Sequence, residues 1–107
     1  MEISANFGYG IILTEKDIQS LGIGFKEVRK LVSDKLPDMS VVVVGDFNAP
    51  EIEIAVLARE TVQTIWNRAC IVYPPKLKKE KRKELNADIQ RVFPNKQIGW
   101  VLSGYAG

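Results

Sequence analysis

Apolar residues alternate with polar residues or glycine at the start of the chain. From Ile3 to Leu13 the odd positions are Ile, Ala, Phe, Tyr, Ile and Leu, and the even positions up to Gly10 are Ser, Asn and two glycines. This period of two residues predicts a β-strand with one face toward the core. The glycines let another group approach the other face closely, and we favour crowded packing over a ligand or a partner chain as the reason for them.

Two helices and a strand are expected next. Thr14 and the acidic turn after it predict the N-cap of a short helix, and Phe25–Leu36 shows the helical spacing of an amphipathic helix before Pro37 ends it. The run Val41–Val44 has no alternation. It predicts a strand that is buried on both faces and therefore central in its sheet.

The segment from Asn48 to Tyr73 is compatible with two folds. In one, a turn leads into a returning antiparallel strand along which Ile52, Ile54, Val56 and Ala58 alternate. In the other, Asn48 caps a long helix with Pro50 in its first turn. The many β-branched residues favour the strand, and the helix stays open as the alternative.

Two prolines at 74 and 75 precede a predicted helix that continues to Phe93, and "KQIGWVLSGY" predicts a last strand. These elements indicate an α+β fold, with a mixed, mostly antiparallel sheet of about four strands covered by two main helices. A length of 107 residues suits a single compact domain, residues 1–107. Apolar runs are too short for a membrane span and the N-terminus lacks a signal-peptide pattern, so we expect a cytoplasmic protein without membrane contact.

The chain contains no histidine and a single cysteine, Cys70. The absence of histidine argues against Ser-His-Asp and Cys-His catalysis and against zinc sites of the Cys/His kind. One cysteine cannot form a disulfide within the chain, and its apolar surroundings indicate a core thiol. We therefore expect no enzyme, no catalytic residue, no metal ion and no cofactor.

One short motif points the other way. "VVVVGDFNAP" is similar to the strand and "GDFN" motif of the endonuclease/exonuclease/phosphatase family, which implies that Asp46 and Asn48 contact the nucleophile and the scissile phosphate. The chain departs from that family because it is much shorter and lacks the histidine that the family uses near its C-terminus. We read the motif as turn chemistry. A Mg²⁺ ion held by Asp46, Glu51 and Glu53 is the enzymatic alternative.

The stretch "KLKKEKRKEL", residues 76–85, holds six of the fifteen basic residues. With two glutamates its net charge is +4, while the rest of the chain is at −2. The apolar face of the predicted helix stops at Leu85, so most of these cations should project into water. The candidates for binding an anion or an acidic partner are Lys76, Lys78, Lys79, Lys81, Arg82 and Lys83.

A solvated helix face explains this basic stretch most simply, and an acidic protein surface and a nucleic acid are the functional alternatives. The stretch has no aromatic residue to stack on a base, and it is richer in lysine than in arginine. Both observations argue against the reading of a base sequence.

Aromatic residues near both ends of the chain form a second candidate surface. Phe7, Tyr9, Trp100 and Tyr105 come close together if the first and last strands pair, and aromatic residues are enriched at protein interfaces. Core packing accounts for most of them more simply. Tyr105 is the one we expect to be most exposed.

Three runs, "FGYGIILTEKDI", "VVVVGDF" with the later "ARETVQT", and "IGWVLSGYAG", are similar to those of small uncharacterised α+β proteins encoded by bacteriophages. The resemblance implies an accessory role such as binding a host factor in the host cytoplasm, and it indicates no site residue. We therefore expect a non-enzymatic protein-interaction module, with binding of nucleic acid or nucleotide phosphate through residues 76–83 as the alternative. An edge strand also allows self-association.

Overall fold

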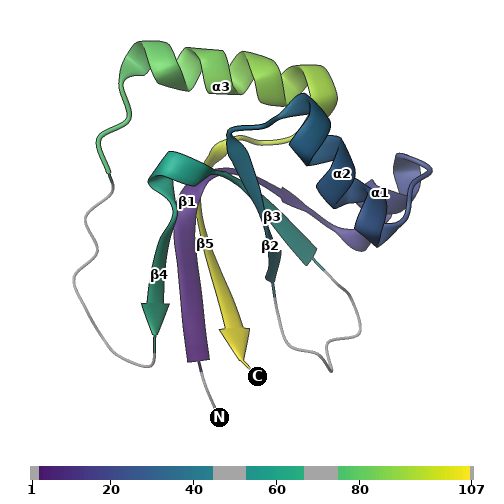
Figure 1. The fold of residues 1–107 in the computed structure, drawn as a ribbon, viewed down its shortest axis with the longest axis horizontal. Coiled ribbons are helices and arrows are strands. Elements are labelled where there is room, and N and C mark those ends of the chain that lie inside the picture. The colour runs from purple at the N-terminus through teal and green to yellow at the C-terminus, as the bar shows by residue number, and fades with distance from the viewer. Residues whose placement is uncertain (1–2, 45–52, 67–74, 107) are drawn as a thin grey trace.

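The computed structural model describes residues 3–44, 53–66 and 75–106. In these residues it has five strands, three α-helices and one 3-10 helix, η1 (Figure 1). The strands are β1 (Ile3–Leu13), β2 (Met39–Val44), β3 (Glu53–Ala58), β4 (Gln63–Trp66) and β5 (Gly99–Ala106), and the helices are α1 (Glu15–Ser20), α2 (Phe25–Lys35), η1 (Arg59–Thr61) and α3 (Lys79–Val92). None of the described helices is long and apolar enough to cross a membrane.

The strand β1 organises the sheet because strands pair with it on both sides. β5 pairs antiparallel with β1 from Gly10↔Gly99 to Ile3↔Ala106. On the other side β3 pairs with the second half of β1 and β4 with the first half, and β2 lies outside β3. The predicted α+β fold is confirmed. All described pairings are antiparallel, and the described sheet has five strands where about four were expected.

The interruption between β3 and β4 is the main irregularity of the sheet. β1 advances three residues, from Phe7 to Gly10, while the facing chain covers six, from Gln63 back to Leu57. The additional residues form η1, which lifts the chain away from β1. The buried Thr61 hydroxyl fills the gap, since it accepts a hydrogen bond from the Tyr9 N–H at 3.0 Å and donates one to the Ala58 carbonyl at 2.7 Å. The buried amide is therefore satisfied by a side chain where the ladder is broken.

The two interpretations of the segment after the valine run are now separated. β3 and β4 show that the strand interpretation is correct for residues 53–66 and that the long helix is wrong. Residues 54–58 are all buried, with the β-branched Ile54 and Val56 on one face of β3 and Ala55 and Leu57 on the other. The turn that was predicted around Asn48 lies outside the described residues.

The valine run was assigned the wrong position in the sheet. β2 is an edge strand that pairs only with β3 among the described strands, and Val43 is exposed. The run lacks alternation because both faces of β2 meet apolar neighbours. Val41 packs against the main core, and Val42 packs against a small second cluster on the opposite face.

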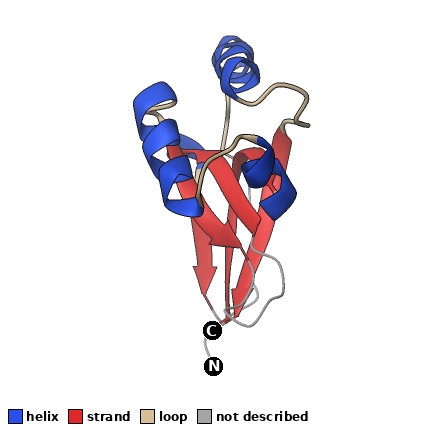
Figure 2. Cartoon of the chain, turned by 90° about the vertical axis from the view of Figure 1, so that its right-hand side faces the viewer, coloured by secondary structure: helices blue, strands red, loops and turns tan. Residues whose placement is uncertain are grey.

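The helices cover one face of the sheet at one end. Figures 1 and 2 show the helices gathered around this end, while β1, β4 and β5 continue beyond them. The sheet also curls, because Cα atoms of its two outer strands, β2 and β5, come within 8 Å of each other. The core between helices and sheet consists of Tyr9, Ile11, Leu13, Ile18, Val28, Val32, Leu36, Met39, Ile54, Val56, Ala58, Leu85, Ile89 and Phe93.

A capping box begins α1, as the sequence predicted for Thr14. The Thr14 hydroxyl accepts from the Asp17 N–H, and the Asp17 carboxylate accepts from the Thr14 N–H at 2.9 Å. The same carboxylate accepts from Lys96 Nζ at 2.6 Å, so one side chain connects α1 to the segment before β5. The hydrogen bond from Lys96, and then those from Thr14, lower the pKa of Asp17 below its ordinary value of 3.8.

Close contact with β3 explains the two glycines of β1. A Cβ atom built on Gly10 would lie 1.8 Å from the Val56 carbonyl oxygen, and one on Gly8 would lie 3.1 Å from a Leu57 methyl carbon. Crowded packing against β3, which we favoured from the sequence, is therefore the reason for both glycines.

We expect Gly10→Ala to destabilise the fold by about 3 kcal/mol or more, because a backbone carbonyl cannot move aside as a flexible side chain can. Urea denaturation followed by circular dichroism measures the effect. Gly99→Ala is the matched control, since Gly99 pairs with Gly10 and a Cβ there meets nothing within 4 Å. Equal losses in the two variants would contradict the explanation.

Asp17→Asn should lower the free energy of unfolding at neutral pH by about 0.5 kcal/mol, because it removes a partly exposed ion pair. The pKa of Asp17 is lowered by folding, so its contribution is complete well above pH 3.8 and is lost as the pH falls through the folded value. The difference between wild type and variant should therefore shrink below about pH 4. A difference that persists in acid, measured by thermal unfolding, would refute this assignment.

Candidate interaction surfaces

The pairing of β1 with β5 brings the predicted aromatic residues together. Tyr9 faces Trp100 and Phe7 faces Leu102 across the ladder. The rings of Phe7 and Trp100 are stacked, with centroids 5.3 Å apart and planes 4° from parallel. Tyr9 meets the same indole edge-on at 5.4 Å and 71°. Two rings of β1 therefore fix the orientation of the indole on β5.

The four aromatic candidates differ in their access to solvent. Tyr9 is only 5% exposed, and its hydroxyl donates to Asn86 Oδ1 of α3 at 2.7 Å, so it belongs to the core. Phe7 is half-buried and Trp100 is 39% exposed. The Tyr105 side chain lies outside the described part of the structure.

Leu102 completes an apolar surface that sequence reasoning did not select. It lies on the same face as Trp100, and with 68% of its surface exposed it is the most exposed large hydrophobic residue described. Alternation along β5 places Leu102 on the face of Trp100, and the arrangement of the helices leaves this part of the sheet bare. We call Phe7, Trp100 and Leu102 the aromatic surface.

The basic stretch lies at the N-terminal end of α3. Lys76 and Lys78 precede the helix, whose N-cap is Lys78, and no side chain provides a capping hydrogen bond. Leu77 packs against the core, as expected of an anchor. All six cations are exposed except Lys81, which is half-buried, and none forms an ion pair with a described carboxylate. The first turn of α3 thus combines exposed cations with the positive end of the helix dipole.

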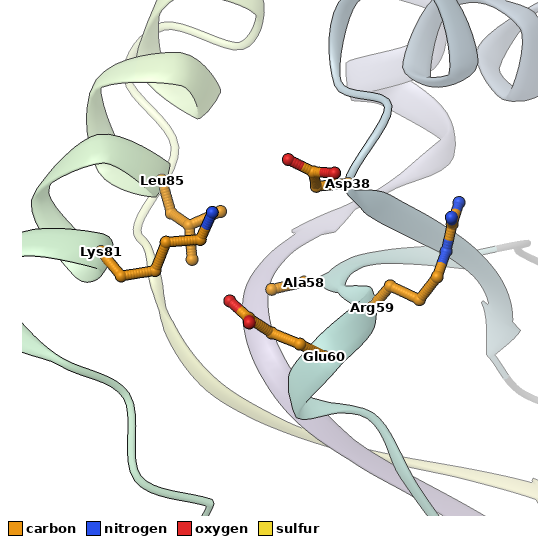
Figure 3. Close-up of a pocket in the computed structure, with 6 residues that line it drawn as sticks. All are labelled: Asp38, Ala58, Arg59, Glu60, Lys81 and Leu85. Atoms are coloured by element: carbon orange, nitrogen blue, oxygen red, sulfur yellow. The ribbon is translucent and has the colours of Figure 1, made fainter.

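Lys81 differs from the other cations because it points into a pocket. The pocket is about 300 Å³ in volume and lies between α3, η1 and the start of β2. Figure 3 shows the carboxylates of Asp38 and Glu60 pointing into the same space as the Lys81 ammonium group, which Leu85 and Ala58 also line, whereas the Arg59 side chain points away. Lys81 therefore faces acidic groups of its own chain, and five basic residues remain fully directed at solvent.

No sequence pattern connects the charged groups around this pocket. Asp38, Glu60 and Lys81 lie in three separate segments, and only the packing of α3 over η1 brings them together. The carboxylates partly offset the positive potential on one side of α3. The remaining five cations keep the basic stretch as a candidate surface.

The enzymatic alternative cannot be located in the described residues. Asp46, Asn48, Glu51 and Cys70 all lie outside them. Within the described ranges, no group of three or more cysteine or acidic residues could hold a metal ion.

Comparisons with family models, with curated proteins and with solved structures found no match. The functional argument therefore depends on the surfaces of the chain itself.

Proposed function

We propose that the chain is a non-enzymatic protein-interaction module that binds its partner through the aromatic surface. The observation that carries the proposal is the exposure of Leu102 beside the stacked pair Phe7 and Trp100, on a part of the sheet that no described helix covers. Isolated exposed hydrophobic residues are ordinary, but adjacent ones on a rigid face are typical of interaction sites.

The rigidity of the aromatic surface supports this role. The rings of Phe7 and Trp100 are held by each other and by the β1–β5 ladder, so a partner would restrict few additional rotamers. Large aromatic side chains with little freedom left are the usual anchors of protein interfaces. The similarity to phage-encoded proteins favours a host protein as the partner, and the absence of histidine favours binding over catalysis.

We expect Leu102→Asp to abolish capture of the partner from host-cell lysate, because a carboxylate at the centre of the contact would lose its hydration. Leu21→Asp is the matched control, since Leu21 is 38% exposed but lies at the end of α1. The captured protein should be retained after nuclease treatment. Loss of capture in both variants, or in neither, would contradict the proposed surface.

Binding of a phosphate-rich ligand by the basic stretch is a second candidate function. It is favoured by the five solvent-directed cations and by the first turn of α3, whose backbone N–H groups have no side-chain cap. Such contacts would recognise phosphate groups without reading bases.

The charge-reversal variant Lys78→Glu/Lys79→Glu/Arg82→Glu tests this second function with a fluorescent single-stranded oligonucleotide. If the basic stretch binds phosphate, wild-type affinity falls steeply with added salt and the variant loses about tenfold or more. The control is Lys26→Glu/Arg29→Glu/Lys30→Glu, which reverses three exposed cations on α2. Equal binding by both variants would exclude the basic stretch as the site.

A further inference from the structure

The outer edge of β5 carries unpaired backbone groups whose positions follow from the register. The Tyr9 N–H points to Thr61, on the side of β1 away from β5. In an antiparallel ladder the N–H and C=O of one residue point to the same side, so Tyr9 and Trp100 face each other without exchanging hydrogen bonds. The polar backbone atoms of Trp100 therefore point outward. By alternation the same holds for Leu102, Gly104 and Ala106.

The sequence of β5 lacks the residues that usually prevent edge-to-edge pairing. β5 has eight residues, and none of them is charged or proline. Cα atoms of β2 come within 8 Å of β5, but no described strand forms a ladder with its outer side. An exposed edge of this length and composition is a template for another strand.

The other free edges of the sheet are protected, which makes β5 distinctive. The Arg59 N–H donates to the Asp38 carbonyl within the β2–β3 register, so the Met39 carbonyl points to the outer side of β2. Arg59 Nη2 donates to that carbonyl at 3.4 Å and Nε donates to Ser40 Oγ at 3.3 Å, which places a cation on the β2 edge. In the described part of the chain β4 has four residues, which makes it a short edge.

We infer that β5 pairs antiparallel with β5 of a second copy of this chain and joins two sheets across a twofold axis. A second copy is favoured because a twofold axis places each strand against itself, so a charge near the axis would meet its own copy, and β5 has no charge. A register centred near Leu102 or Ser103 also sets Trp100 opposite Gly104 or Ala106, where small residues leave room for the indole.

This pairing would enlarge the aromatic surface. The Leu102 side chains of the two copies would lie side by side on one face of a continuous sheet, with a Phe7–Trp100 stack on each side. The inference concerns the backbone edge and does not depend on the proposed partner protein. Sedimentation velocity measures self-association and capture from lysate measures partner binding, so either proposal can fail without the other.

Sedimentation velocity of the purified chain over a range of concentrations tests the inference with two variants at one position. Leu102→Pro removes an outward N–H without breaking a β1–β5 hydrogen bond, and we expect it to abolish the dimer. Leu102→Ala keeps that N–H and should weaken dimerisation by about tenfold. A wild type that stays monomeric, or a Leu102→Pro variant that still dimerises, would overturn the inference.

Hydrogen exchange of the wild type provides a test that no folding defect can obscure. Raising the protein concentration should slow exchange of the outward amides of Trp100, Leu102, Gly104 and Ala106 by about tenfold or more. The outward amides of Val41 and Val43 on β2 are the internal control and should not change. Exchange at β5 that is independent of concentration would also overturn the inference.

Discussion

The fold depends on how the backbone of β1 is satisfied where its neighbouring strand is interrupted. On the side of β1 away from β5, Tyr9 has no strand partner, because the chain leaves the ladder at η1, and the Thr61 hydroxyl takes the place of a backbone carbonyl. A buried N–H left without an acceptor would cost about 1–3 kcal/mol. The hydroxyl also bonds back to Ala58, so the same residue closes the 3-10 turn and completes the sheet.

The interruption has consequences for the whole architecture. It separates β3, which continues with β2 beneath the helices, from β4, which accompanies the first half of β1. The apolar residues of one end are covered by α2 and α3, whereas those of the other end are not. The aromatic surface and the bare edge of β5 both lie in this uncovered region. The two proposed contacts thus have one structural origin.

The sequence predicted those elements whose side chains repeat with a clear period. β1 and β5 follow from alternation, α2 from its helical spacing, and the start of α1 from the capping signal at Thr14. Local chemistry determines these features, so a single sequence is sufficient to find them.

Features set by distant contacts were not accessible in this way. The valine run of β2 looked central because curling of the sheet gives an edge strand two apolar neighbours. The acidic surroundings of Lys81 come from Asp38 and Glu60, which no local pattern connects to α3. The aromatic candidates were partly found from the sequence, but the exposure of Leu102 depends on where the helices end.

The β1–β5 ladder also affects the order in which the sheet can assemble. Its pairs join residues as far apart as Ile3 and Ala106, so the most extensive ladder of the sheet is also the one that closes the largest loop. Contacts of such sequence separation slow folding. On a ribosome, β1 emerges long before β5 is synthesised. Until then the Phe7 ring lacks the Trp100 indole on which it stacks. A nascent chain therefore carries a central strand whose edge toward β5 is unpaired, which is where we expect a chaperone to engage it first.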